Sequence, residues 1–418
     1  MVTMSNYATY QPSRNALQLR ITAAQRDFWA FALWVLVTFV QFKNDELLLY
    51  PLALYFAYAI WRDQKQVLPL MARGWVVLLF ALWCLISPIW AVEPMGAFKN
   101  ALYLLLTILI CFHVAAVLSA RQIMHAVVFA TGAIAVLSLY VGLTSGHLNL
   151  GVFPQKNTMG KSMVILFAAA SATAMDSGSR PFLRLLAAAL AILAAFLAAV
   201  SESATAVLLL LGVGGVVLLG KIIVSGGPQR ASRLSLAFLF ISALFFAASV
   251  VVPTLQENPV DQVLDKFGKD STLTGRTLLW DFADEQIAER PFVGVGAEGF
   301  WRYNASPTVQ MIFEEFHKRP GDAFNFHNSY YEIAVHQGLI GLTLAVVATL
   351  WAQGKLVAGA WRLATMPFVF FLAQSVAVLA RTVTESDFLR PFVLFHMLFW
   401  IGALIVLKEG MHRQNDRS

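Results

Sequence analysis

Long runs of apolar residues recur along almost the whole of this 418-residue chain. Each run extends over about 16 to 22 residues, and short charged or Gly/Pro-containing segments separate it from the next. A helix of about 20 residues crosses the ~30 Å hydrocarbon core of a bilayer. Because the runs are continuous rather than alternating, membrane-spanning strands are excluded. With 58% hydrophobic and only 13% charged residues, the chain is too apolar for one water-soluble core.

The pattern therefore predicts an all-α, polytopic membrane protein with about twelve transmembrane helices. The expected spans are 27–42, 46–61, 75–90, 101–118, 123–143, 160–175, 182–200, 204–224, 234–252, 329–351, 365–380 and 389–407. Three parts follow from them: residues 1–252 with the first nine helices, a long loop at 253–328, and residues 329–418 with the last three helices and a tail.

The distribution of Lys and Arg predicts the orientation of these helices. With the N-terminus inside, seventeen of the 30 basic residues fall in short cytoplasmic segments, six in short outer segments and seven in the long loop. Basic residues accumulate in cytoplasmic loops, so we expect a bacterial inner-membrane protein with both termini in the cytoplasm and the long loop in the periplasm. The same rule explains the net charge of +6, which therefore does not indicate nucleic-acid binding.

Polar residues at the outward helix ends are the first functional candidates, because such residues are costly in a membrane unless they pair or function. Lys156, Asn157 and Lys161 lie where the sixth span begins. Two positive charges beside the free N–H groups of a helix N-terminus suit a phosphate. The structural alternative is an interfacial turn with snorkelling lysines.

The long loop carries the second cluster, around Arg276. A short amphipathic helix is expected after Thr274-Gly275, with breaks at Arg290-Pro291 and at residues 318–320. An Arg at the mouth of such a helix offers planar bidentate donors to a diphosphate. The alternative is an ion pair between Arg276 and one of the loop acids, such as Asp281.

The third cluster lies where the chain re-enters the membrane, and contains His327, Asn328 and Tyr330. A histidine there can donate to a phosphate or accept a proton from a sugar hydroxyl near neutral pH, although a lone interfacial histidine is more often structural. A fourth candidate pair is Arg381 and Glu385 in the last outward loop. Four residues apart, these two would pair with each other in a helix, which is the structural alternative.

Two further patterns do not indicate cofactor or metal sites. Gly294 to Gly299 matches the dinucleotide fingerprint, but no βαβ unit flanks it. A set of acidic and His residues in the loop lacks the spacing of zinc or calcium ligands and reads as a solvated face. Its members are Glu314, Glu315, His317 and Asp322. No cofactor and no metal is therefore expected.

Residues 327–341, which read HNSYYEIAVHQGLIG, resemble the signature of the O-antigen ligase and polymerase superfamily. The segment TGRTLLW at 274–280, followed by RPFVGVG, resembles the start of that family's periplasmic region. Residues 82–101 are similar to its turn between the third and fourth spans. Residues 151–160 and 381–386 are most similar to the exopolysaccharide polymerase branch of the succinoglycan type.

The resemblance implies a membrane-embedded glycosyltransferase without nucleotide sugar or metal. Its substrates would be an oligosaccharide on undecaprenyl diphosphate and an acceptor hydroxyl on a glycan or on lipid A-core, among membrane lipids. Arg276 would hold the diphosphate, and His327 would act beside the reacting group. Relatives often carry a basic residue where this chain has Ser201-Glu202-Ser203, so Lys156 or Arg381 is the proposed substitute. Polymerase systems also suggest a chain-length regulator as partner.

Three functions remain open at this point. The first is a polymerase of exopolysaccharide or O-antigen, which the cluster at 151–161 favours. The second is a ligase that transfers finished glycan to lipid A-core, which differs only in the acceptor. The third is a polysaccharide transporter without covalent chemistry, although the inverted repeats and interrupted helices typical of transporters are not evident.

Overall fold

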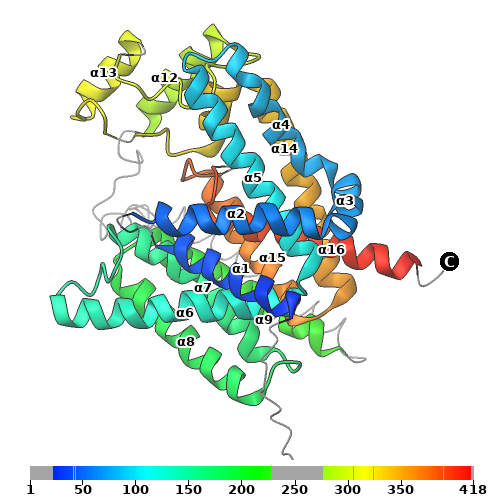
Figure 1. The fold of residues 1–418 in the computed structure, drawn as a ribbon. Helices are drawn as coiled ribbons and strands as arrows, with labels where there is room; N and C mark the ends of the chain where they lie inside the picture. Colours follow the sequence, from blue (N-terminus) through cyan, green and yellow to red (C-terminus); the bar gives the residue numbers. More distant parts are fainter. Residues whose placement is uncertain are drawn as a thin grey trace, which may run out of the picture.

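The computed structural model describes residues 22–226 and 276–415, apart from residues 41, 43, 305, 323 and 389. Within these residues the chain forms fourteen α-helices and no strand, so the all-helical prediction is confirmed (Figure 1). The expected span 234–252 and the first part of the expected loop, 253–275, lie outside the described residues.

The first part of the chain contains nine helices, most of them close to the expected spans. They are α1 (Ala23–Phe39), α2 (Glu46–Arg62), α3 (Gln64–Arg73), α4 (Leu79–Ile86), α5 (Pro94–Val117), α6 (Ala120–Ser145), α7 (Lys156–Met175), α8 (Pro181–Val200) and α9 (Ala204–Ser225). Short 3-10 turns flank α4 at Trp75–Leu78 and Ser87–Ile89. Helix α3 was not expected, because Lys65, Pro69 and Arg73 interrupt its apolar pattern.

The second part contains α12 (Arg276–Glu289), α13 (Pro307–Glu315), α14 (Ser329–Leu363), α15 (Met366–Thr382) and α16 (Leu394–Asn415). The predicted loop helix is confirmed by α12, which ends one residue before Arg290-Pro291. Among the described residues, seven helices are long and apolar enough to cross a membrane, while α2 and α15 are apolar but shorter. The protein is thus a polytopic helical membrane protein, and the total of twelve spans stays a prediction.

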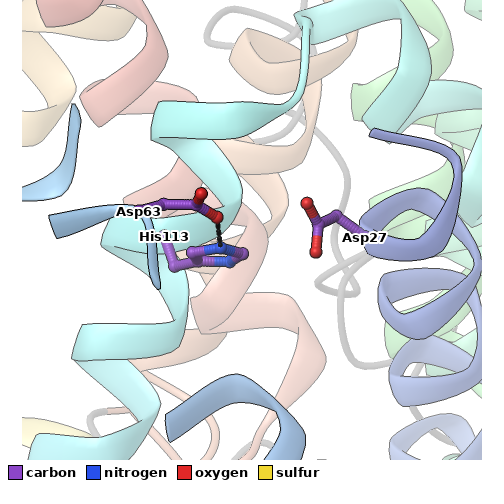
Figure 2. A group of neighbouring side chains, drawn as sticks. All are labelled: Asp27, Asp63 and His113. Carbon is purple, nitrogen blue, oxygen red and sulfur yellow. Dashed lines mark hydrogen bonds and ion pairs between the residues drawn. The ribbon is translucent and has the colours of Figure 1, made fainter. Parts of the chain in front are cut away.

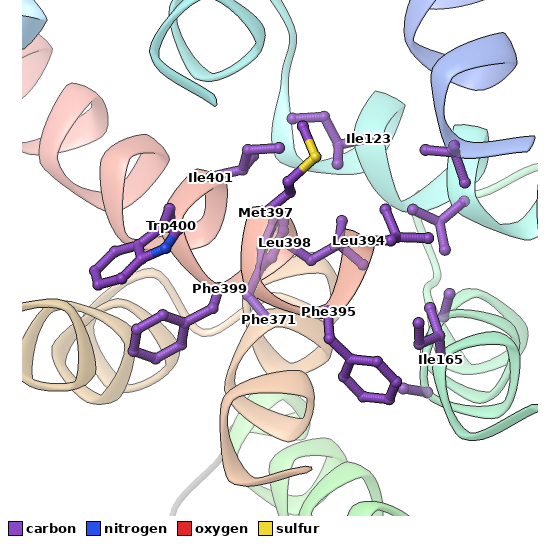
Figure 3. Close-up of a cluster of buried hydrophobic side chains, with 14 of the residues drawn as sticks. Ile123, Ile165, Phe371, Leu394, Phe395, Met397, Leu398, Phe399, Trp400 and Ile401 are labelled. Carbon is purple, nitrogen blue, oxygen red and sulfur yellow. The ribbon is translucent and has the colours of Figure 1, made fainter. Parts of the chain in front are cut away.

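Helix α16 lies at the centre of the bundle. Its consecutive residues Met397, Leu398 and Phe399 are all fully buried, although they point in different directions around the helix (Figure 3). A helix that is apolar on every side must be surrounded by other helices. In contrast, the described helices bury only 22% of the apolar stretch of α9, against 67% for α16, so α9 lies at the edge of the described bundle. The bundle therefore has a packed centre and a peripheral layer suited to lipid.

Helix α14 is broken near its start. Gly338 has φ 67° and ψ −178°, which interrupts the helix after Gln337. The backbone groups freed by the break are hydrogen-bonded elsewhere: Leu339 N–H donates to the Pro291 carbonyl (2.7 Å), and Trp83 Nε1 donates to the Gln337 carbonyl (3.1 Å). In hydrocarbon an unsatisfied backbone group costs several kcal/mol, so the break needs these partners.

Helices α12 and α13 form a separate layer at one end of the bundle, at the upper left of Figure 1. They enclose a second hydrophobic cluster with Leu279, Val309, Phe313 and Phe326 as buried members. Val335 of α14 belongs to the same cluster. This layer therefore packs on the first turns of α14, at the point where the chain re-enters the bundle.

An ionic network joins α1, α2 and α5. Arg62 Nη2 lies 2.7 Å from Asp27 and 2.5 Å from Asp63, and the Asp63 carboxylate also accepts from His113 Nε2 at 3.0 Å. Figure 2 shows Asp63 and His113 together, with Asp27 facing them from α1. Two carboxylates and a histidine resemble a cation site, but the Arg62 guanidinium already supplies the positive charge between them. We therefore assign the network to helix packing.

Candidate functional site

Helix α12 is anchored to the segment that carries His327. Trp280 Nε1 donates to the Phe326 carbonyl at 3.0 Å, and the Trp280 ring stacks on Tyr331 with centroids 5.7 Å apart. Arg276 lies four residues before Trp280 and therefore on the same face of α12. That face is directed at residues 326–331. The predicted second and third clusters are thus brought together.

His327 has a restrained and unusual backbone. Its φ is 52°, in the left-handed region that non-glycine residues seldom adopt, and its N–H donates to Asn325 Oδ1 at 2.9 Å. Phe326 on one side is fully buried, and Asn328 on the other is 8% exposed. Strained backbone of this kind persists only where its surroundings hold it, and it clusters at functional sites. The backbone that carries the half-buried imidazole is thereby held in place.

The electrostatics of the site link its ionisable groups. Burial lowers the pKa of His327, and the nearby charge of Arg276 lowers it further, while Glu385 opposes the shift. Burial also lowers the pKa of Arg276, while the negative charge of Glu385 acts to raise it. Arg276, His327 and Glu385 are therefore within electrostatic reach of one another. The imidazole is neutral at pH 7 and can accept a proton.

The last outward loop completes this group. Asn328 N–H donates to Ser386 Oγ (3.0 Å), and Ser329 Oγ donates to the Glu385 carbonyl (2.6 Å). Asn328 is the N-cap of α14, where its side chain accepts from Tyr330 N–H at 2.9 Å. The hydroxyls of Tyr330 and Thr382 lie 3.1 Å apart. Asn328 and Tyr330 thus have structural contacts of their own beside His327.

Arg381 does not form the ion pair with Glu385 that was the structural alternative for these two residues. Helix α15 ends at Thr382, so Glu385 is not on the same helical face, and Arg381 Nη2 instead pairs with Asp387 at 2.5 Å. The Arg381 side chain is 2% exposed and stacks over the Phe395 ring at 4.3 Å. Burial would raise the pKa of Asp387, but Arg381, His396 and Lys161 outweigh it and lower that pKa to about 2.

Arg381 and Lys161 line a cavity of 520 Å³ between α1, α2, α7 and the loop at 383–393, which we call the α7 cavity. Arg390 lines it as well, so three basic side chains face the cavity together with three acidic ones, Asp45, Glu298 and Asp387. The α7 cavity shares Asn100, Glu298 and Arg390 with a neighbouring cavity. The two spaces are therefore adjacent.

Lys156 and Asn157 are exposed at the start of α7, and neither lines these cavities. Lys156 Nζ lies 3.5 Å from Glu202 Oε2. A Cβ on Gly160 would lie 2.6 Å from Ser201 Oγ, so the start of α7 packs closely on the turn at 201–203. Lys156 is thus next to the turn at 201–203, where the sequence analysis proposed it as a substitute cation.

The neighbouring cavity, of 290 Å³, contains residues that the sequence argument missed, and we call it the Glu332 cavity. The Glu332 carboxylate accepts from Trp301 Nε1 (3.0 Å) and from Phe326 N–H (3.1 Å). His336 Nε2 lies 3.3 Å and Arg390 Nη2 3.4 Å from the same carboxylate. The signal was present in the sequence, because Glu332 and His336 are ionisable residues four apart in an apolar span.

Aromatic and hydrogen-bonding side chains dominate the wall of the Glu332 cavity. Trp301 and Phe324 line it with Asn100, Asp322 and Ser386. Aromatic faces with carboxylates and amides are suited to a polyhydroxylated ligand, whereas the α7 cavity has mixed charges and offers the Lys161 ammonium to an anionic group. Ser386 also bonds to Asn328, so the Glu332 cavity adjoins the His327 segment.

Comparison with known proteins shows what the chain is similar to. The O-antigen ligase family matches residues 186–346, a range that includes Arg276 and His327. The chain is 28% identical over 395 residues to the exopolysaccharide production protein ExoQ of Rhizobium meliloti (strain 1021), covering 90% of this chain and 87% of that protein. It is 23% identical over 299 residues to a protein of Rickettsia conorii named as a candidate polysaccharide ligase, covering 69% of this chain and 68% of that protein.

The motifs around Arg276 and His327, the helical membrane fold and these similarities point to the same group of proteins. The matched regions include the long polar segment and the helix that follows it. The similarity to the exopolysaccharide production protein extends over most of the chain rather than over one motif. This chain is accordingly similar to the O-antigen ligase family and to an exopolysaccharide production protein, which agrees with the resemblance that its sequence motifs indicated.

Proposed function

We propose that this protein joins lipid-linked oligosaccharides at the periplasmic face of a bacterial inner membrane, as an exopolysaccharide or O-antigen polymerase. The donor would be an oligosaccharide on undecaprenyl diphosphate. The observation that carries the proposal is the electrostatic coupling of Arg276 with the imidazole of His327, next to a segment that adjoins the Glu332 cavity. Neither residue lines that cavity, whose aromatic and polar wall is suited to sugar.

In the proposed reaction an acceptor hydroxyl attacks the anomeric carbon of the donor sugar. The bond from that carbon to the diphosphate oxygen breaks, and its electron pair leaves with undecaprenyl diphosphate. His327 takes the proton of the attacking hydroxyl, and Arg276 stabilises the charge that develops on the diphosphate. Because the diphosphate is already a good leaving group, orientation and counter-charge account for most of the catalysis.

The other predicted site residues receive supporting roles in this proposal. Lys161 and Arg381 supply positive charge in the α7 cavity. The negative charge of Glu385 partly compensates the positive charge of Arg276. Asn328 and Tyr330 hold the start of α14, which fixes the direction of His327. Lys156 and Asn157 would contact the diphosphate or its lipid from the start of α7, beside the turn at 201–203. A chain-length regulator remains a proposed partner.

The test is complementation of a deletion strain with His327→Ala or Arg276→Ala, while lipid-linked repeat units and surface glycan length are followed. We expect glycan synthesis to fall about 100-fold or more in each variant, since a general base and a charge-stabilising donor each contribute on that order. His317→Ala and Arg302→Ala are matched controls, because both residues are exposed in the same polar region. Normal glycan in both site variants contradicts the assignment.

A ligase is the second candidate, favoured by the description of the matching family. The same experiment separates the two. Loss of polymerisation leaves single lipid-linked repeats, whereas loss of ligation leaves long chains on the lipid carrier. A third outcome, in which full-length lipid-linked glycan accumulates on the cytoplasmic side in the variants, favours a transporter.

A further inference from the structure

Four basic residues from separate parts of the sequence gather around one cavity at the far ends of α14 and α16. The cavity has a volume of 470 Å³, and Arg73, Lys355, Arg362 and Arg413 line it together with apolar residues and Gln414. No acidic residue lines it within the described part of the chain. We call it the Arg362 cavity.

The positive charge of this cavity is not neutralised by the described residues. None of the four basic side chains forms an ion pair with a carboxylate there, and Arg73 Nη1 donates only to the neutral Gln414 Oε1 at 3.4 Å. The Lys355 ammonium lies 5.6 Å from the Trp351 ring centroid. Arg73, Arg362 and Arg413 are exposed, so their guanidinium groups can reach an anion from outside.

An apolar groove of 600 Å³ adjoins the Arg362 cavity, and we call it the α14 groove. It is lined by residues of α9, α14 and α15, including Ile223, Val357 and Leu372. Ala358 and Arg362 line both the groove and the cavity. The basic Arg362 cavity thus borders directly on the apolar α14 groove.

The location is remote from the proposed active site. Lys355 follows the break at Gly338 by 17 residues, which corresponds to about 25 Å of helix. Arg413 is likewise near the end of α16, whose first residues follow the outward loop at 383–393. In Figure 1 the C-terminal end of α16 lies at the right, while α12 and α13 lie at the upper left.

We propose that the Arg362 cavity binds the phosphate of an anionic phospholipid headgroup, with an acyl chain of the same lipid in the α14 groove. Guanidinium groups match phosphate oxygens bidentately. Basic pockets between membrane helices on the cytoplasmic side are suited to anionic headgroups. The adjoining apolar groove favours a lipid over a free anion, because only a lipid can place a phosphate in the basic cavity and an acyl chain in the groove.

The test uses the full chain, purified in mild detergent and titrated with phosphatidylglycerol or phosphatidylcholine under native mass spectrometry. A triple variant carries Arg73→Gln, Arg362→Gln and Arg413→Gln. Each basic residue near a membrane surface contributes about fivefold to anionic lipid affinity, so we expect about 100-fold weaker phosphatidylglycerol binding. Binding of phosphatidylcholine is expected to stay unchanged.

The control variant removes three positive charges elsewhere on the same predicted face, by Lys65→Gln, Arg180→Gln and Arg184→Gln. We expect it to bind phosphatidylglycerol like the unmodified protein. A variant with Arg73→Lys, Arg362→Lys and Arg413→Lys keeps the positive charge, and we expect it to retain most of the preference for phosphatidylglycerol. This variant separates a loss of binding from a loss of folding. Unchanged lipid binding in the triple Gln variant overturns the proposal.

Two further measurements address the groove and the source of the phosphate. A Cβ on Gly354 would meet no described atom within 4 Å, so Gly354→Trp can fill the groove without removing any charge. We expect it to weaken phosphatidylglycerol binding. If it leaves lipid binding intact, the acyl chain does not lie in the α14 groove, and that part of the proposal is wrong. Displacement of the lipid by millimolar inorganic phosphate likewise overturns the lipid assignment.

Discussion

His327 shows how single residues define this site. Its left-handed backbone is held by Asn325 and by buried neighbours, and Arg276 approaches it from a helix that Trp280 fixes to the Phe326 carbonyl. Glycines have a comparable role a few residues away. A Cβ on Gly294 would lie 2.5 Å from the Val335 carbonyl. The glycines that match the dinucleotide fingerprint therefore allow this segment to pack closely on α14.

The lowered pKa of His327 predicts the pH dependence of transfer. Because burial and Arg276 favour the neutral imidazole, the base form persists below the ordinary pKa of about 6.5. A base with the ordinary pKa loses its first tenfold near about pH 5.5, so we expect kcat/KM to reach that loss only below about pH 5.5 and to decline about tenfold per unit thereafter. The measurement is transfer by the protein in vesicles that contain lipid-linked repeats.

The Arg276→Gln variant tests whether the charge of Arg276 lowers the pKa of His327. Removing the positive charge leaves burial as the main cause that lowers the pKa of His327, so we expect this pKa to rise. The fall of kcat/KM on the acid side of the pH profile, its acid limb, should then move to higher pH. NMR titration of labelled histidine checks the pKa where residual activity is too low. An acid limb that does not move shows that the two groups are not coupled.

Gly338→Ala is expected to destabilise the protein strongly. Gly338 has φ 67°, and a Cβ there would lie 2.2 Å from the Phe292 carbonyl group. Backbone strain of this kind costs about 1–3 kcal/mol before any clash is counted. Thermal unfolding in detergent measures the effect, and Gly212→Ala in α9, where a Cβ meets no described atom within 4 Å, is the control. Equal melting temperatures for both variants refute the argument.

At the scale of elements, the broken helix α14 and the loop between α15 and α16 organise the site. The break at Gly338 lets the 291–296 segment hydrogen-bond to α14, which brings Glu298 and Trp301 to the Glu332 cavity. The loop at 383–393 bonds to the start of α14 on one side and lines the α7 cavity on the other. These two elements thus connect both cavities to His327.

The Arg381–Asp387 pair predicts a pH-dependent contribution to stability. The pKa of Asp387 is about 2 in the folded protein and about 3.9 when unfolded, so the stabilisation is complete above about pH 3.9 and is lost as the pH falls through about 2. At neutral pH, Asp387→Asn leaves the buried Arg381 guanidinium without its carboxylate, which costs about 3–5 kcal/mol.

Chemical unfolding in detergent measures this cost. Glu202→Gln is the control, because it breaks the exposed Lys156–Glu202 pair, for which we expect a loss of about 0–1 kcal/mol. Replacing both buried partners by Arg381→Met and Asp387→Leu should recover part of the stability. Equal losses for Asp387→Asn and Glu202→Gln would mean that the buried pair is not a structural requirement.

At the scale of the whole molecule, the two ends of the bundle differ in chemistry. One end has the acidic and aromatic Glu332 cavity with Arg276 and His327, and the other has the basic Arg362 cavity. All four basic residues of the latter belong to segments predicted to be cytoplasmic. The arrangement is what the positive-inside rule requires of one consistent orientation.

Cysteine labelling tests this orientation. Cys84 and Cys111 are 3% and 0% exposed, so the native background should be inert. Glu314→Cys and His412→Cys place single thiols on exposed positions of α13 and α16. An impermeant maleimide should label position 314 in spheroplasts and position 412 only after the membrane is opened. The reverse pattern means that the predicted topology is inverted.

The sequence by itself determined the helical membrane class, most helix positions and the motif residues around 276 and 327, because run length and local motifs need no knowledge of distant partners. Only the tertiary structure decided which partner each polar residue has. It paired Arg381 with Asp387 rather than Glu385, and it set Glu332 among Trp301, His336 and Arg390. The physical reason is that packing brings together side chains from separate helices, and periodicity along one helix does not encode those neighbours.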